Sequence, residues 1–445
     1  MSTRYKPGTG VFMDERFPGL FRDDDSRPAR SHVDLVTVEA AAGFGILPSQ
    51  RIAELIDNKT IDSLAKVRAD QIQPASLDLR LGKTAYRIRA SFLPGRNETL
   101  TNQLSQLKLH QFDLTEGAVL EKGFVYLVQL KESLKLPKSI AAVANPKSST
   151  GRLDVFVRLI TENSEMFDYV EPGYRGPLYA EISPRSFSIK VREGSRLNQI
   201  RFRQLAPAHA KHQTFVLSDR ALKNLHETSP LVDKDPVIRQ GLHVRVDLAG
   251  ANPGKVIGYR AKRHAGIVDV DQVGRYQIAE FWEPMIAQAN RRLILDPLEF
   301  YILASREALH IPPLYAAEMV PIDPMMGEFR VHYAGFFDPG FGHPAAGGAG
   351  SRAVLEVRSH EVPFFLEDGQ MVGRLVYEKL AELPEHLYGQ SLGSNYQRQG
   401  LKLSKHFIMP KRKAPDVSFE VRVRINKPRS SKKKVAVKKV PKATA

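Results

Sequence analysis

A short run of residues with the types needed to bind phosphate lies between two apolar segments of the chain. Residues 145–152 read NPKSSTGR, so that Lys147, two serines, a threonine, a glycine and Arg152 lie close together. The cations and hydroxyls can donate to the oxygens of an oligophosphate, and the glycine lets backbone N–H groups approach those oxygens closely. Taken alone, the run favours an ordinary surface turn.

Two glutamates stand in similar surroundings further along the chain. Glu181 lies at the end of the predicted hairpin VEPGYRGPLYAEI, and Glu356 stands in the related run LEVR. A buried glutamate with a raised pKa can take a proton from water and return it to a leaving group. These two residues are therefore candidates for acid–base chemistry.

The segments around these residues predict a β-rich scaffold. Runs such as SLDLRLG, FVYLVQL, LYAEI and FSIKV alternate apolar and polar residues and are separated by turn residues, a pattern typical of an all-β barrel or sandwich. Ahead of them, Ser49 is the predicted N-cap of a short helix with Ile52, Leu55 and Ile56 on its apolar face. We therefore expect the 145–152 run to be a loop between strands and Glu181 to end a hairpin.

The chain contains an internal repeat with an offset of 175 residues. Three pairs of positions match at this offset, namely Pro137 with Pro312, Glu181 with Glu356 and Gly194 with Gly369. The expected organisation is an extended arm (1–42), repeat 1 (43–215), a linker (216–234), repeat 2 (235–408) and a basic, largely disordered tail (409–445).

Together these motifs resemble the dCTP deaminase family within the dCTP deaminase and dUTPase superfamily. The resemblance runs from Ile46 through QPASLDLRLG (73–82), the KSSTGR loop and the EPGYRG hairpin to YGQSLGSNYQRQGLKLS (388–404), which is similar to the family's C-terminal lid. It implies a mainly β fold of two tandem dUTPase-like distorted barrels or sandwiches with short helices. A dUTPase is expected to have an Asp-centred hairpin where this chain has Glu171.

The resemblance implies an enzyme that converts dCTP to dUTP and ammonia and so supplies dUMP and thymidylate synthesis. It gives Glu356 or Glu181 the proton transfers, with Ser148 and Arg152 as the other catalytic groups. The substrate-binding set that it implies is Lys147, Ser148, Ser149, Thr150, Gly151, Arg152, Glu171, Tyr179, Ala180, Asp338, Leu355, Tyr388 and Gln399.

The composition of the chain directs the expected mechanism away from zinc. Zinc deaminases hold their metal with histidine and cysteine, and this chain contains no cysteine. His110, His243, His310 and His332 lie singly among predicted strands, so we expect no protein-bound metal site. A glutamate would then activate the water that attacks C4 of cytosine, and Mg²⁺ would enter only with the triphosphate.

Repeat 2 departs from the family pattern at the phosphate loop. Residues 322–329 read IDPMMGEF and lack the lysine, serines and arginine, so we expect repeat 2 not to bind a triphosphate with its own loop. Residues 343–351, HPAAGGAGS, predict a flexible insert, and Asn395 stands where deaminases often have lysine. Glu356 is slightly favoured over Glu181, because its surroundings and the lid both lie in repeat 2.

The positive charge of the chain is concentrated at its end. Residues 411–445 carry 13 basic and two acidic residues, a net charge of +11, so that the other 410 residues carry +5 of the total of +16. This tail predicts a solvated segment or a weak nucleic-acid contact. No membrane-spanning run or signal peptide is recognisable, so we expect a cytoplasmic protein without membrane contact, and the resemblance implies a trimer-based homo-oligomer.

Two other functions stay open on the sequence alone. The first is a dUTP pyrophosphatase or a bifunctional enzyme that releases dUMP. The second is a regulator that binds nucleotides without turning them over. Release of ammonia, release of pyrophosphate, and binding without turnover distinguish the three.

Overall fold

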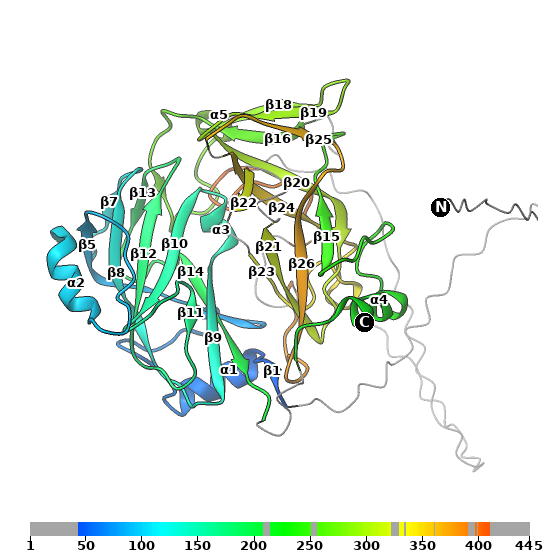
Figure 1. Ribbon diagram of the computed structural model, residues 1–445. Helices are drawn as coiled ribbons and strands as arrows, with labels where there is room; N and C mark the ends of the chain where they lie inside the picture. Colours follow the sequence, from blue (N-terminus) through cyan, green and yellow to red (C-terminus); the bar gives the residue numbers. More distant parts are fainter. Residues whose placement is uncertain are drawn as a thin grey trace, which may run out of the picture. The chain divides into compact units, whose positions relative to one another are not determined.

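The computed structural model describes residues 43–207, 214–250, 256–321, 329–332, 335–359, 361–389, 397 and 399–409. Strands, with a few short helices, build two β-rich halves (Figure 1). The strands of repeat 1 are β1 (Gly45–Ile46), β2 (Ile61–Ser63), β3 (Ile72–Gln73), β4 (Ser76–Asp78), β5 (Leu81–Ile88), β6 (Lys108–Asp113), β7 (Ala118–Leu120), β8 (Val125–Lys135), β9 (Ile140–Pro146), β10 (Val155–Thr161), β11 (Tyr169–Val170), β12 (Arg175–Pro184), β13 (Ile189–Val191) and β14 (Asn198–Gln204).

Two six-stranded sheets form the body of repeat 1. One has the order β11-β9-β14-β4-β3, with β1 paired to β14, and the other has the order β10-β12-β8-β5-β6, with β2 paired to β8. The helices of this half are α1 (Ser49–Asp57), η1 (Ala69–Gln71), α2 (Leu100–Leu107) and α3 (Ser148–Gly151).

Repeat 2 is built in the same way. Its sheets have the orders β15-β26-β21-β23 and β18-β16-β20-β24-β22, with a separate β19-β25 ribbon and a short β17 that pairs with β13 of repeat 1. The elements are α4 (Asp219–Thr228), β15 (Leu242–Arg245), β16 (Val256–Ala261), β17 (Val268–Asp269), α5 (Ile278–Phe281), β18 (Trp282–Ile286), β19 (Arg292–Leu295), β20 (Phe300–Leu309), β21 (Tyr315–Pro321), β22 (Phe329–His332), β23 (Phe336–Phe337), η4 (Pro344–Ala346), β24 (Ser351–Ser359), β25 (Phe364–Glu367) and β26 (Met371–Lys379).

The register of the strands confirms the internal repeat. Glu181 of β12 lies opposite Leu127, and Glu356 of β24 lies opposite Ile302, so both partners are shifted by the same 175 residues. A buried ion pair is repeated as well, because Nε of Arg80 donates to Glu132 at 2.8 Å and Nε of Arg245 donates to Glu307 at 2.6 Å. The mainly β tandem fold is therefore as the sequence predicts.

The hydrophobic core crosses the boundary between the repeats. One core cluster joins repeat 1 residues to Trp282, Phe300, Ile302 and Val354 of repeat 2, whereas a second cluster lies within repeat 2. Trp282 is fully buried and contacts Phe187 at a ring-centroid distance of 5.2 Å. The described residues, from 43 to 409, accordingly belong to one compact unit.

Three local predictions differ from the structure. Ser49 is the first residue of α1 rather than its N-cap, because the extended backbone that an N-cap needs belongs to Pro48. The segment 216–234, expected to be a linker, contains α4, whose Leu222 is buried in the second core. The insert 343–351 contains η4, and its Gly348 packs so tightly that an added Cβ would lie 2.3 Å from a backbone carbon of Gly342.

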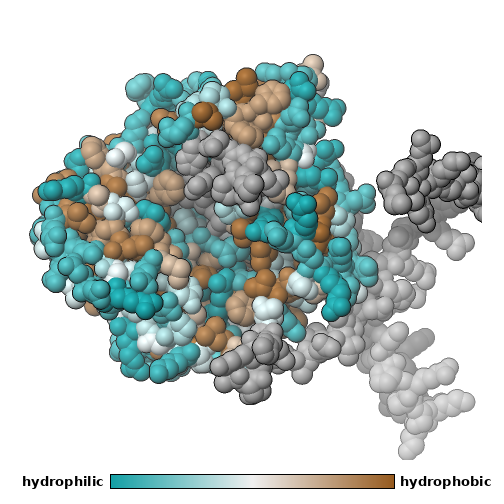
Figure 2. All heavy atoms as spheres, in the orientation of Figure 1, coloured by the Kyte–Doolittle hydropathy of each residue, from teal (hydrophilic) through white to brown (hydrophobic). Residues whose placement is uncertain are grey.

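The surface facing the viewer in Figure 2 mixes hydrophilic residues with small groups of hydrophobic ones. Exposed apolar side chains occur on β18 and on the β19-β25 ribbon of repeat 2, where Ile286 is 55% exposed and Ile294 is 56% exposed. No helix among the described residues is long and apolar enough to cross a membrane.

Candidate active site

The KSSTGR run forms a one-turn helix, α3, rather than an irregular loop. Lys147 is its N-cap, and its carbonyl accepts hydrogen bonds from Thr150 N–H at 2.8 Å and Gly151 N–H at 2.9 Å. Ser148 and Ser149 line a cavity with Lys147, while Thr150 and Gly151 are buried behind them. Because the first amides of a helix have no intrahelical acceptor, this end of α3 suits an anion.

Arg152 follows α3 and points into the same cavity. Its Nη1 donates to Gln399 Oε1 at 3.1 Å and to the Lys402 carbonyl at 3.0 Å, and its Nε lies 3.9 Å from Glu356 Oε1. Arg152 is 3% exposed. One guanidinium of repeat 1 therefore contacts both the carboxylate and the C-terminal segment of repeat 2.

Glu356 occupies the middle of β24 and faces α3 of repeat 1. Its side chain is almost completely buried, and this burial raises its pKa to about 8 although Arg152 acts in the opposite direction. The nearby carboxylate of Asp154 also raises the pKa. A glutamate with this pKa is neutral in the empty site at pH 7 and can donate a proton.

A second ion pair crosses the boundary beside Arg152 and Glu356. Arg358, two residues after Glu356, pairs with Asp154, two residues after Arg152. Ser186 Oγ donates to the same Asp154 carboxylate at 2.6 Å. Both charged groups are buried, so the pair fixes β24 against the start of β10 and holds Glu356 in register with α3.

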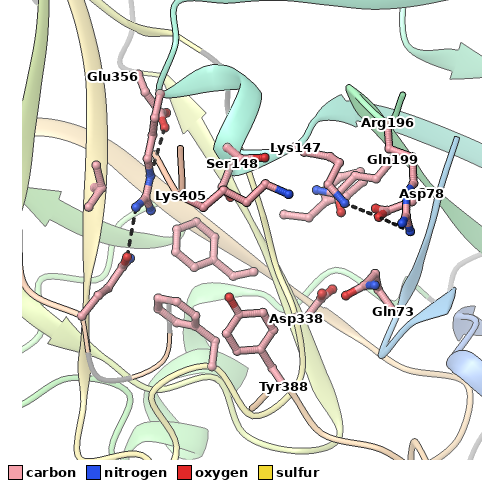
Figure 3. A pocket seen from close by; sticks show the side chains of 18 of the residues that line it. Gln73, Asp78, Lys147, Ser148, Arg196, Gln199, Asp338, Glu356, Tyr388 and Lys405 are labelled. Carbon is pink, nitrogen blue, oxygen red and sulfur yellow. Dashed lines mark hydrogen bonds and ion pairs between the residues drawn. The ribbon is translucent and has the colours of Figure 1, made fainter. Parts of the chain in front are cut away.

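The cavity has a volume of about 400 Å³ and has chemically distinct ends (Figure 3). Glu356 lies on one side in this view, and Lys147, Asp78 and Arg196 lie on the other, with Lys405 between them. Residues of both repeats and of the C-terminal segment line it. Their full set is Asp70, Gln73, Asp78, Lys147, Ser148, Ser149, Arg152, Arg196, Gln199, Val270, Asp271, Met319, Gly335, Phe336, Phe337, Asp338, Phe341, Val354, Glu356, Tyr388, Gln399 and Lys405.

Charged residues crowd the end of the cavity away from Glu356. Lys147 forms an ion pair with Asp78, and Arg196 lies 3.6 Å from the same carboxylate. Lys405 enters from the C-terminal segment, and its pKa is lowered first by burial and then by the neighbouring Lys147. Three cations therefore share a small space, which favours a polyanionic ligand there.

Aromatic rings line another wall of the cavity. Phe341 lies 5.6 Å from Tyr388 and 5.2 Å from Phe337 between ring centroids. Asp338 stands beside them and accepts from Arg201 at 3.2 Å, while burial raises its pKa. Flat apolar surfaces next to polar groups are suited to a nucleoside.

The C-terminal strap, residues 399–409, closes over α3. Ser404 Oγ donates to the Ser149 carbonyl at 2.6 Å, and the Lys405 carbonyl accepts from Gly274 N–H at 2.9 Å. Phe407 packs against Trp282 at a ring-centroid distance of 5.9 Å. The strap is therefore anchored on both sides of Lys405.

Glu181 lies outside this cavity, although it is the repeat-1 equivalent of Glu356. Its carboxylate pairs with Arg158 at 2.5 Å and is 2% exposed. The structure also places four other predicted residues away from the cavity, since Glu171 is exposed, Tyr179 contacts Glu162, and Ala180 and Leu355 are core residues.

Several cavity residues were missed by the sequence reasoning. Asp78 stands in the quoted QPASLDLRLG motif, so its motif was a usable signal, whereas Arg196 and Lys405 had none of this kind. The structure gathers Lys147, Ser148, Ser149, Arg152, Asp338, Glu356, Tyr388 and Gln399 from the predicted set. Asn395, residues 322–328 and the tail from residue 410 lie outside the described residues.

Comparison with family models decides the relationship. The model described as the N-terminal domain of 2'-deoxycytidine 5'-triphosphate deaminase matches residues 43–206, and the model of the C-terminal domain matches residues 218–407. The chain belongs to the dCTP deaminase family. It is accordingly a dCTP deaminase enzyme rather than only a nucleotide-binding protein.

Relatives in the dCTP deaminase family support this assignment. A "dCTP deaminase, dUMP-forming" of Persephonella marina is 33% identical over 165 residues, which are 36% of this chain and 84% of that protein. The "dCTP deaminase" of Halorubrum lacusprofundi is 27% identical and aligns over 30% of this chain and 64% of its own length. The crystal structure of 2'-deoxycytidine 5'-triphosphate deaminase from Agrobacterium tumefaciens is 56% identical, with a TM-score of 0.72, and covers 76% of this chain and 99% of that one.

Proposed function

We propose that each chain hydrolyses dCTP to dUTP and ammonia, without zinc, at one site formed by both repeats. The observation that carries this proposal is the contact between Glu356 and Arg152 across the repeat boundary. The same cavity holds the Lys147 and Ser148 end of α3, so a proton-transfer group and an anion site lie together. A cytosine nucleotide needs both.

The expected orientation follows from the chemistry of the cavity. The triphosphate lies along Lys147, Ser148 and Ser149, the base lies toward Glu356, and the aromatic wall that includes Tyr388 lies beside the nucleoside. Charge-assisted hydrogen bonds hold the phosphates, while the rings exclude water around the base. C4 of cytosine then faces the Glu356 carboxyl.

Glu356 carries the proton transfers in this proposal. As a neutral acid it donates a proton to N3, and the carboxylate then takes a proton from the water that attacks C4. The acid next protonates the amino group, and the carboxylate recovers a proton from the C4 hydroxyl as ammonia leaves. Arg152 and Ser148 orient the water and stabilise the charge that develops on its oxygen.

The surroundings of Glu181 support a single site for each chain. The positions equivalent to Ile302 and Val354 are Leu127 and Tyr179, and these pack against α2 and the residues before it. In repeat 2 the same positions pack into the core shared with repeat 1. The strand that carries Glu181 is therefore covered by the segment around α2, whereas the equivalent side of the strand that carries Glu356 is covered by repeat 1.

Magnesium would enter with the triphosphate. Asp78 is a carboxylate at the phosphate end, and its Oδ1 is buried without a hydrogen-bond partner among the described residues, which fits a hard cation. A bound Mg²⁺ would neutralise part of the phosphate charge. The chain's own residues bind and orient the nucleotide and move its protons.

A second candidate is formation of dUMP at the same site. Relatives such as the Nanoarchaeum equitans protein, 28% identical over 186 residues, carry the name "dCTP deaminase, dUMP-forming". Further hydrolysis of dUTP would release dUMP and pyrophosphate. This reaction needs a water directed at the α-phosphate in addition to the one directed at C4.

Product analysis tests the proposal. Purified protein, dialysed against a zinc chelator and supplied with Mg²⁺, should convert dCTP to equal amounts of dUTP and ammonia. Appearance of dUMP with pyrophosphate supports the second candidate. Absence of ammonia, or zinc present at one equivalent in the active protein and required for turnover, contradicts the proposal.

A further inference from the structure

The strap contributes a cation to the phosphate end of the cavity that the predicted binding set does not contain. Lys405 lies beyond the 388–404 segment that resembles the family lid, whereas Asn395 replaces a frequent lysine inside that segment. Lys405 lines the cavity together with Lys147 and Arg196. We propose that Lys405 binds the terminal phosphate of the nucleotide and makes the site selective for triphosphates over diphosphates.

The position of Lys405 is fixed by its neighbours. Ser404 is hydrogen-bonded to the Ser149 carbonyl, and His406 Nε2 lies 2.9 Å from the Val270 carbonyl. The backbone of Lys405 itself accepts from Gly274 N–H. Because these anchors hold the strap before any ligand arrives, little backbone entropy is lost when Lys405 meets a phosphate.

The charged neighbours of Lys405 assign it to the phosphates rather than to the base. Glu356 marks the base side, and Lys147 with Asp78 marks the opposite side, as Figure 3 shows. Lys405 experiences the charges of Lys147, Arg196, Asp78 and Asp271, so its ammonium group belongs to the phosphate side. A nucleotide that ends at the second phosphate brings less negative charge into this space.

The local charge balance favours a polyanion. Asp78 faces Lys147 and Arg196 at this end, and Asp271 is held by Arg192 at 3.2 Å and by Ser195 at 2.7 Å. The repulsion between Lys405 and the two other cations is relieved when an anion binds among them. The third phosphate supplies that anion.

Binding measurements test this role separately from catalysis. The inference rests on the proposed function for the choice of nucleotide, so the Glu356→Gln protein is used because it should leave dCTP intact. In that background, Lys405→Met should weaken dCTP binding by about 10-fold or more and dCDP binding by less than about 2-fold, measured by titration calorimetry. Lys405→Arg should retain the preference for dCTP over dCDP. The binding of inorganic tripolyphosphate should be weakened by Lys405→Met about as much as the binding of dCTP.

Lys83→Met is the matched control, since Lys83 is 64% exposed and pairs with Asp113 at the surface. Thermal denaturation of every variant distinguishes a lost contact from a lost fold. Equal weakening of dCTP and dCDP by Lys405→Met, or no weakening of either, overturns the inference. If the unaltered protein binds dCTP but releases no ammonia, the proposed function fails. The inference about Lys405 is still decided by the comparison of dCTP binding with dCDP binding.

Discussion

At the scale of single residues, burial and pairing compete at Glu356. An arginine 3.9 Å away should lower the pKa of a carboxyl group, yet the pKa is raised to about 8. Burial outweighs the ion pair because the carboxyl group is almost completely buried, whereas the nearest nitrogen of Arg152 lies at the long distance of 3.9 Å. Glu181, at the equivalent position of repeat 1, differs because it forms a close ion pair with Arg158 at 2.5 Å.

The raised pKa of Glu356 predicts a dependence of stability on pH. Between its ordinary value of 4.5 and about 8, the folded protein binds more protons at this group than the unfolded protein does. The contribution of Glu356 to the free energy of unfolding therefore falls as pH rises, by at most about 1.4 kcal/mol per pH unit. The denaturation midpoint of Glu356→Gln should therefore rise relative to that of the unaltered protein as the pH is raised from 5 to 8. A constant difference across this range would contradict the pKa.

Arg152→Ala should lower kcat/KM for dCTP by about 100-fold or more, because it removes a charge-assisted donor from a site with little water. Arg96→Ala is the control, since this side chain is 77% exposed and pairs only at the surface with Glu165. Arg158 is unsuitable as a control, because its loss leaves Glu181 buried without its ion pair. Similar rates for Arg152→Ala and Arg96→Ala would show that α3 is only a turn.

At the scale of elements, the sequence predicted the strands better than the connections. Alternating apolar residues predict the strands that carry Glu181 and Glu356, because Leu178, Ala180 and Ile182 of β12 lie in the first core and Ala353, Leu355 and Val357 of β24 lie in the second. Helix α4 was taken for a linker, since its buried residues are few and its partners lie in distant strands. The resemblance to a lid predicted a role for residues 388–404, but not the contacts of the strap with Ser149 and Arg152, because these contacts join residues about 250 positions apart.

Truncation separates the strap from the basic tail. A chain that ends at Ile425 retains the whole strap and should keep kcat within about 2-fold. A chain that ends at Gln397 loses the acceptors of Arg152 at Gln399 and Lys402, so its kcat should fall by about 100-fold or more. Rates of ammonia release, with circular dichroism to verify folding, give the comparison. An active shorter chain would show that the strap does not hold Arg152 for catalysis.

At the scale of the whole molecule, the two repeats provide different parts of one site. The 175-residue offset was readable from the sequence and is repeated in the strand register. Which glutamate meets Arg152 was not readable, because it depends on how the two repeats pack against each other. The trimer-based assembly, the cytoplasmic location and the nucleic-acid contact of the tail stay predictions.

The central claim is that Glu356, and not Glu181, performs proton transfer beside Arg152. Substitution by glutamine keeps the shape of each side chain and removes its acid–base function. With dCTP as substrate, Glu356→Gln should lose about 100-fold or more in kcat for ammonia release, while Glu181→Gln stays within several-fold of the unaltered protein. A severe loss confined to Glu181→Gln, or no loss in either variant, would contradict the account.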